Sequence, residues 1–78
     1  MKPDYTQSLT SFGMALREAR LESGQSQEAL ALKVGLDRTF VSATERGRKN
    51  PTLVSMLRLC EGLDVSLAQL LSRMSKLK

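Results

Sequence analysis

The chain has 78 residues, 41% of them apolar, and a formal net charge of +4, which suits one small domain with a single core. One cysteine and no histidine exclude an intramolecular disulfide and argue against a zinc site. Apolar runs stay well short of the roughly 20 residues that span a bilayer and the start of the chain is polar, which predicts a cytoplasmic protein without membrane contact.

The first predicted helix begins near Ser8 or Leu9 and ends at Gly24. Its apolar residues recur every three or four positions, at Leu9, Phe12, Leu16 and Ala19. This spacing is typical of a helix that packs one face against a core. We place that core at about residues 9–74, with short loose ends.

Two short helices are predicted next, over residues 27–34 and 38–46. Gly35 lies where the backbone leaves the first of them in a left-handed conformation, which glycine adopts without steric cost. Ser26 and Asp37 are expected to cap the two helices by accepting hydrogen bonds from free backbone amides. Two short helices hinged at one glycine are typical of a helix-turn-helix, whose second helix fits the DNA major groove.

Two more helices follow. Thr52 is expected to cap a helix over residues 53–63, with a core face formed by Leu53, Met56, Leu57, Cys60 and Leu63. Ser66 starts a fifth helix, with an apolar stripe at Leu67, Leu70, Leu71 and Met74 and with Val65 just before it. Five helices without an alternating strand pattern make the predicted fold class all-α.

The start of the third helix carries the predicted base contacts. Arg38 and Thr39 project together, and Ser42 and Ala43 lie one turn further along the same side. The planar guanidinium of Arg38 can donate two hydrogen bonds to guanine; a phosphate contact or an ion pair with a nearby carboxylate is the alternative. Thr39 can donate to a base edge or pack against a thymine methyl. Ser42 and Ala43 either permit close approach to the bases or are ordinary small surface residues.

Further polar residues are predicted to hold the DNA backbone. Gln27 opens the second helix, where free amides and the positive end of the helix dipole favour a phosphate oxygen. At the far end of the third helix, four residues can reach another phosphate without reading bases: Arg46, Arg48, Lys49 and Asn50. The surplus of positive charge over residues 33–49 supports this prediction, and the alternative is a set of solvated loop charges.

The chain resembles the Xre or lambda-repressor-like family of bacteria and phages over roughly residues 9–71. The shared pattern runs from Ser26 to Thr52 as S-Q-E-A-L-A-x-K-x-G-L-D-R-T-x-V-S-x-x-E-R-G-R-x-N-P-T. It looks closest to the small restriction-modification controller proteins. The resemblance implies a compact five-helix DNA-binding domain that acts as a dimer on a pseudo-palindromic operator, and it suits autoregulation.

The resemblance also implies roles for particular residues. Glu45 is expected to form a partly buried, structural ion pair with Arg20 in the first helix. Phe40 lies by family position against the sugar-phosphate edge, although it can equally pack on the second helix. The last helix is expected to supply the dimer contact, through Val65, Leu67, Leu70, Leu71 and Met74.

Two positions depart from the family pattern. Gln25 and Thr44 are polar where the family usually has leucine or isoleucine. We expect a slightly looser seat for the third helix, costing on the order of 1–3 kcal/mol if the Thr44 hydroxyl is buried without a partner.

The leading interpretation is a sequence-specific regulator that binds double-stranded DNA as a homodimer and needs no cofactor or small-molecule ligand. An antitoxin-like or adaptor protein, with the fifth helix facing another protein, is the alternative. An enzyme is the least supported class, because the sequence has no histidine, no evident pair of carboxylates in a cleft and no phosphate-binding glycine loop. The operator, the target genes and the sign of regulation are left open.

Overall fold

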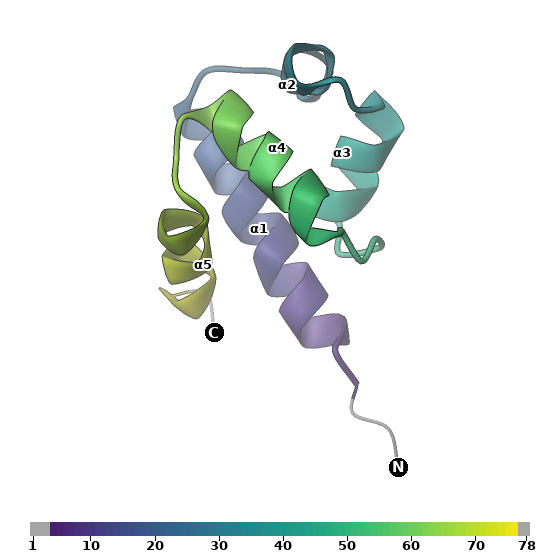
Figure 1. Ribbon diagram of the computed structural model, residues 1–78. Helices are drawn as coiled ribbons and strands as arrows, with labels where there is room; N and C mark the ends of the chain where they lie inside the picture. The colour runs from purple at the N-terminus through teal and green to yellow at the C-terminus, as the bar shows by residue number, and fades with distance from the viewer. Residues whose placement is uncertain (1–3, 77–78) are drawn as a thin grey trace.

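The computed structural model describes residues 4–76, which form five α-helices and no strand (Figure 1). The helices are α1 (Thr6–Glu22), α2 (Gln27–Val34), α3 (Arg38–Glu45), α4 (Leu53–Leu63) and α5 (Leu67–Lys76). α1 packs against α3 and α5, while α2 packs against α3 and α4. The all-α prediction is confirmed, and the predicted loose ends at residues 1–3 and 77–78 lie outside the described residues.

α1 starts and ends slightly earlier than the sequence predicted. Its start is supported by Asp4, whose Oδ1 accepts hydrogen bonds from the backbone nitrogen of Thr6 at 2.9 Å and from its hydroxyl at 2.6 Å. The helix stops at Glu22, because Gly24 adopts a φ of 74° and turns the chain away. None of the described helices is long and apolar enough to cross a membrane.

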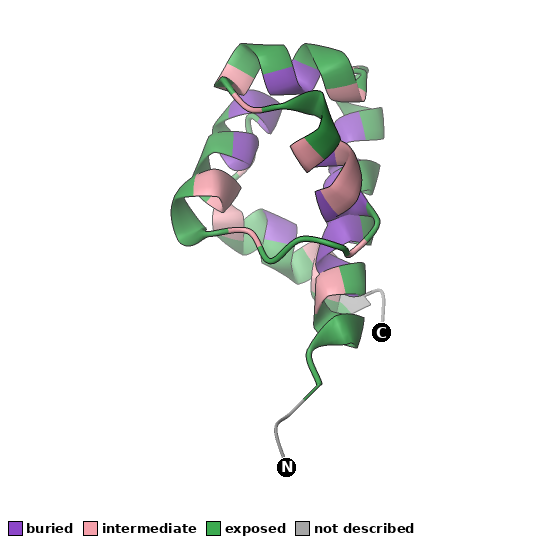
Figure 2. Cartoon of the chain, turned by 90° about the vertical axis from the view of Figure 1, so that its right-hand side faces the viewer, coloured by how far each residue is buried: buried purple, intermediate pink, exposed green. Residues whose placement is uncertain are grey.

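Buried residues lie along the inner faces of the helices (Figure 2). The core contains Phe12, Ala15, Leu16, Ala19, Leu30, Ala31, Val41, Leu59, Cys60, Leu63 and Leu70. In the apolar stripe predicted for the first helix, Phe12, Leu16 and Ala19 therefore face the core, whereas Leu9 is half-buried and does not belong to it. Burial also raises the pKa of the Cys60 thiol, as expected for an unreactive core cysteine.

The inner face of α4 differs from the prediction. Leu53 is 58% exposed and Leu57 is 48% exposed, so these two assignments to the core are wrong. Leu59, which the sequence analysis left out, is fully buried beside Cys60. The helix is oriented so that the stripe through Met56, Leu59, Cys60 and Leu63 faces the core. This stripe and the predicted stripe both have the three- and four-residue spacing of a helix face.

The caps of α2 and α4 agree with the sequence. The Ser26 hydroxyl accepts a hydrogen bond from the backbone nitrogen of Ala29 at 3.0 Å, and Thr52 does the same for Ser55 at 3.1 Å. Gly35 ends α2 with a φ of 72°. The predicted hinge between α2 and α3 is therefore present.

The predicted cap by the Asp37 carboxylate is wrong. Asp37 does occupy the N-cap position of α3, but its side chain makes no capping hydrogen bond. Its backbone carbonyl accepts from the nitrogens of Phe40 at 3.1 Å and Val41 at 3.2 Å. The carboxylate is exposed to solvent.

α5 begins with a reciprocal cap and is anchored in the core. Ser66 and Gln69 bond each other's backbone nitrogens through their side chains, at 3.0 Å and 2.8 Å. Leu70 is fully buried within the monomer, so it packs in the core, and the predicted dimer contact through the last helix stays a prediction. The neighbouring apolar residues are half-buried against the core (Val65, Leu67 and Met74) or exposed (Leu71, 43%).

Candidate nucleic-acid interface

α3 has one buried side and one open side. Val41, Thr44 and Glu45 are buried, whereas Arg38 and Thr39 at the start of the helix are exposed. Ser42 and Ala43 are half-buried. The helix therefore presents its polar N-terminal part to solvent, on the edge of the molecule where Figure 1 shows α3.

The buried side of α3 is held by an ion pair between Arg20 and Glu45. The guanidinium donates from Nε to Oε2 at 2.6 Å and from Nη2 to Oε1 at 3.0 Å, while its Nη1 donates to the carbonyl of Gln25 at 2.9 Å. The hydrogen bond to Glu45 raises the pKa of Arg20. Both charges have several partners, as burial requires.

The two departures from the family pattern do not loosen the packing of α3 against the rest of the molecule. The Thr44 hydroxyl is buried but donates to the carbonyl of Phe40 at 2.7 Å. Gln25 donates from Nε2 to the carbonyl of Gly62 at 3.1 Å. Among the described residues, every buried side-chain nitrogen and oxygen has a partner, so the expected cost of an unpaired hydroxyl does not arise.

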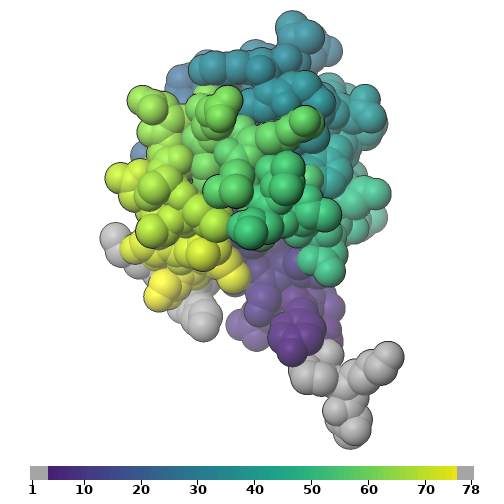
Figure 3. Space-filling model, in the orientation of Figure 1, coloured from purple at the N-terminus to yellow at the C-terminus, as the bar shows by residue number. Residues whose placement is uncertain are grey.

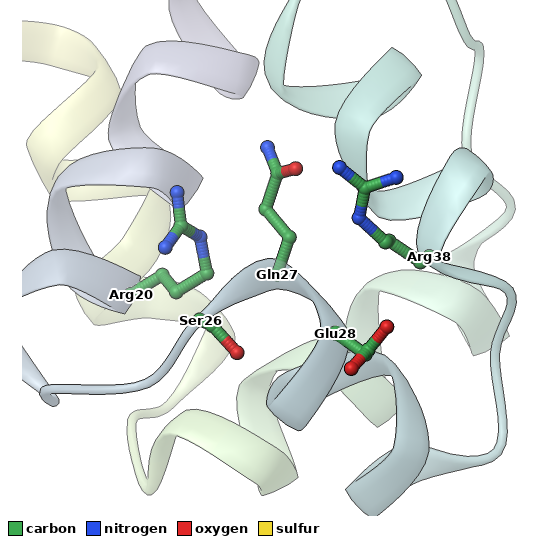
Figure 4. Close-up of a pocket in the computed structure, with 5 residues that line it drawn as sticks. All are labelled: Arg20, Ser26, Gln27, Glu28 and Arg38. Atoms are coloured by element: carbon green, nitrogen blue, oxygen red, sulfur yellow. The ribbon is translucent and has the colours of Figure 1, made fainter.

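A shallow concavity lies where α2 begins beside α3 (Figure 4). Its lining comes from the end of α1, the start of α2 and the start of α3: Arg20, Ser26, Gln27, Glu28 and Arg38. Gln27 donates from Nε2 to Glu45 Oε1 at 3.0 Å. In this way the buried ion pair is linked to the first residue of α2, on the side that faces solvent.

Arg38 stands free at the mouth of this concavity. The ion pairs among residues 4–76 join Arg20 with Glu45 and Arg73 with Glu18 and Glu22, and none includes Arg38. The alternative role of Arg38 as the partner of a neighbouring carboxylate is therefore not adopted in this structure. Phe40 is half-buried, a position compatible with either of its two expected roles.

The far end of α3 carries the second basic group. Its four predicted backbone-contact residues are all exposed: Arg46, Arg48, Lys49 and Asn50. Gly47 turns the loop with a φ of 75° and lies against α1, where a Cβ would come within 2.8 Å of Thr10 Cα. The loop is thus fixed on α1, so that basic side chains flank both ends of the open side of α3.

Sequence reasoning missed Gly13, which lets α1 approach the end of α3. A Cβ at this position would collide with the backbone carbonyl oxygens of Thr44 and Glu45. The signal available in the sequence is a glycine inside a helical pattern, where it costs about 1 kcal/mol relative to alanine unless a close contact requires it.

Residues 16–70 match the model of the Helix-turn-helix family. The match spans α2, α3, their turn and α4, together with the second part of α1 and the start of α5. The chain therefore belongs to the helix-turn-helix family of DNA-binding transcriptional regulators.

Within this family, the chain is similar to restriction-modification controller proteins. Control protein C.MunI from a Mycoplasma species is 38% identical over 66 residues, which cover 83% of this chain and 89% of that protein. The crystal structure of the controller protein C.AhdI from Aeromonas hydrophila superimposes with a TM-score of 0.84 and 44% identity, covering 87% of this chain and 99% of that chain. The controller protein C.Esp1396I, crystallised as a tetramer with its natural 35 base-pair operator, gives a TM-score of 0.82 and 37% identity, covering 91% and 96%. The resemblance to controller proteins noted in the sequence is confirmed.

Proposed function

We propose that this protein is a homodimeric, sequence-specific transcriptional regulator of the controller type, which binds a pseudo-palindromic operator in the bacterial cytoplasm and catalyses no reaction. The observation that carries the proposal is the open N-terminal side of α3, whose buried side is clamped by Arg20 and Glu45. A rigid polar helix presented in this way fits the major groove, and its basic flanks suit the two bordering phosphate backbones.

Each exposed residue of α3 has a role in this proposal. Arg38 donates two hydrogen bonds to the N7 and O6 of a guanine, and Thr39 contacts the neighbouring base edge or a thymine methyl. Ser42 and Ala43 are short enough to let the helix approach the base pairs. These four residues make up the proposed reading surface.

Phosphate contacts fix the position of the reading surface. The backbone amides at Gln27, in the first turn of α2, face one phosphate at the positive end of the helix dipole. Phe40, in the first turn of α3, is a further proposed backbone contact. At the other end of α3, the proposed backbone contacts are Arg46, Arg48, Lys49 and Asn50. Such contacts set register and orientation without reading sequence.

A second copy of the chain is the proposed occupant of the apolar surface on α4 and α5. Figure 3 shows these two helices adjoining on one face of the molecule. Three large side chains of α4 are 48–64% exposed, Leu53, Val54 and Leu57, and α5 adds Leu71. C.Esp1396I, which has this fold, assembles on its operator. Pairing through α4 and α5 would bring two reading helices to successive major grooves, about 34 Å apart.

Selection from a random pool of duplex DNA at about 0.15 M salt tests the proposal, since non-specific electrostatic binding is already weakened there. We expect an enriched inverted repeat, whose half-site spacing can then be sought upstream of the protein's own gene, the target that autoregulation requires. Failure to enrich any sequence would contradict the proposal and favour a protein-binding adaptor.

A further inference from the structure

The C-terminal end of α3 is fixed against α1. A Cβ at Gly13 would collide with the backbone carbonyl oxygens of Thr44 and Glu45, so the two backbones lie in close contact there. Arg20 Nε also donates to Glu45 Oε2 at 2.6 Å. This end of the helix therefore cannot shift without moving α1.

The N-terminal end of α3, which carries the first two residues of the reading surface, is held less firmly. Asp37 occupies the N-cap position, but its side chain makes no capping hydrogen bond. Arg38 and Thr39 are exposed, and none of the ion pairs within residues 4–76 includes Arg38. The direction of this first turn therefore depends mainly on bonds within α3 itself.

The side chain of Thr44 bonds the fixed end of the helix to the free end. Thr44 is 1% exposed, and its hydroxyl donates to the carbonyl oxygen of Phe40 at 2.7 Å. In an α-helix the same carbonyl accepts from the backbone amide four residues on, and its two lone pairs can serve both donors. A threonine hydroxyl bonded in this way often bends the helix. Because the C-terminal end is fixed, such a bend changes the position of the first turn.

We propose that Thr44 is a positioning residue for the reading surface and, although it is buried, a determinant of sequence specificity. Its hydroxyl sets the angle at which Arg38 and Thr39 enter the major groove. Leucine and isoleucine, which the family usually has at this position, cannot form the bond, so a relative with the same reading residues would present them at a different angle. The proposal rests on the proposed function.

The effect should fall on discrimination between base pairs and not on affinity in general. Two parallel hydrogen bonds from a guanidinium to guanine need the planar group in one orientation, whereas phosphate contacts carry no sequence information. One hydrogen bond favours one arrangement of the first turn over another by roughly two- to tenfold. That factor sets the size of the expected loss.

The test measures the affinity of the full chain for the selected operator and for operators changed at one base pair at a time. Arg38→Ala first identifies the base pair that Arg38 reads, where discrimination should fall roughly 5- to 150-fold. Thr44→Val keeps the branched shape of the side chain and removes the hydroxyl. It should lower discrimination at that base pair about two- to tenfold, and it should change discrimination there no further when residue 38 is already alanine.

Two further variants separate this effect from a loss of stability. Thr44→Ser keeps the hydroxyl but leaves space for one methyl group, so it should melt at a lower temperature and discriminate like the wild type. Thr52→Val removes a threonine hydroxyl that caps α4, where it accepts from the backbone nitrogen of Ser55 at 3.1 Å. This variant too should melt at a lower temperature and leave discrimination unchanged. Thermal melting of each variant checks the fold, and Thr44→Ala, which also lacks the hydroxyl, replaces Thr44→Val if that variant does not fold.

Three outcomes are distinguishable. A loss of discrimination at the base pair read by Arg38, present in Thr44→Val and absent in Thr44→Ser, supports the positioning role. Unchanged discrimination in Thr44→Val, an equal loss on all sequences, or a loss of the same size in Thr44→Ser overturns it while leaving the proposed function intact. Failure of the wild-type protein to prefer any sequence overturns the proposed function itself.

Discussion

Gly13 sets how closely α1 approaches α3. The backbone carbonyls of Thr44 and Glu45 lie where a Cβ of residue 13 would be. The close packing of α3 on α1 therefore requires a glycine at this position. Arg20, two turns further along α1, then reaches Glu45 at 2.6 Å. The contact at Gly13 requires a residue without a side chain, and the contact at Arg20 requires a charged side chain.

Gly13→Ala should destabilise the protein, although alanine normally stabilises a helix interior by about 0.5–1 kcal/mol. The overlap with fixed backbone atoms should cost about 1–3 kcal/mol, a fall of several degrees in Tm for a domain of this size. Gly62→Ala is the comparison, because the atoms that it would meet belong to the side chains of Val34 and Leu30, which can move. Equal losses in the two variants would contradict this explanation.

Removing one partner of the Arg20–Glu45 pair should cost more than removing both. Arg20→Met or Glu45→Leu leaves an unpaired buried charge and should lower the free energy of unfolding by about 3–5 kcal/mol. The double variant buries two apolar side chains and should melt at a higher temperature than either single variant. If single and double variants melt alike, the ion pair does not have the structural role described here.

Helices α4 and α5 combine core packing with exposed apolar surface. Val54 on α4 is 64% exposed, while Leu70 on α5 is completely buried. A dimer contact must use residues that are exposed in the monomer, such as Val54. Substitution of a buried residue such as Leu70 affects folding before it affects assembly.

Val54→Glu should therefore give a folded monomer. The residue lies in the first turn of α4, where a negative charge suits the helix dipole, so folding should be preserved while the apolar contact is lost. Leu32→Glu is the control, since Leu32 is 82% exposed on α2 and does not belong to the proposed α4–α5 surface. Sedimentation equilibrium measures the mass, and an unchanged dimer of the Val54 variant would place the interface elsewhere.

Ion pairs also hold α5 against α1. Arg73 donates to both carboxylate oxygens of Glu22, at 2.7 Å and 2.8 Å, and to Glu18 at 2.7 Å. These bonds hold the pKa of Glu22 below its usual range and raise that of Arg73. Because the pKa of Glu22 is depressed in the folded state, the contact contributes stability above the usual glutamate range, and the contribution is lost as pH falls through the folded pKa.

Arg73→Gln should return the pKa of Glu22 to the usual range of an exposed glutamate, since the hydrogen bonds that lower it are removed. An NMR titration of the Glu22 side chain measures the shift. Arg58→Gln, which removes an exposed charge from α4 instead, should leave the titration of Glu22 unchanged. A titration that Arg73→Gln does not alter would show that the contact is absent in solution.

The helices could be predicted well where local residues determine them. Ser26 and Thr52 cap their own helices and Gly35 ends α2, because these effects depend on a few neighbouring residues. The rotation of α4 could not be predicted, because stripes through Leu57 and through Leu59 both satisfy helical spacing and only contacts with other helices decide between them.

The candidate site was predictable to a similar extent. The open position of Arg38 follows from its place at the start of α3. The link from Gln27 to Glu45 joins residues 18 positions apart, so no local pattern reveals it. Asp37 does occupy the predicted N-cap position, but its carboxylate makes no capping hydrogen bond, which residue type and position alone do not reveal.

The molecule as a whole presents positive charge at both ends of α3, and this charge should control its affinity for DNA of any sequence. Lys49→Ala should weaken binding to all sequences alike and lower the dependence of log K on log salt by about one unit per half-site. Arg17→Ala removes the same charge from the exposed side of α1 and is the control. Equal effects of the two substitutions would mean that net charge matters and the position of Lys49 does not.

The carbonyl of Gly62 connects α4 with α2 and with the turn before it. It accepts hydrogen bonds from Lys33 Nζ and Gln25 Nε2, both at 3.1 Å, so α2 is tied to the end of α4. In the proposed dimer, each reading helix is thereby fixed relative to the surface that meets the second copy. The length of spacer DNA that the dimer accepts is then set at the α4–α5 contact, and a protein with the same reading residues could recognise a differently spaced repeat by changing that contact alone.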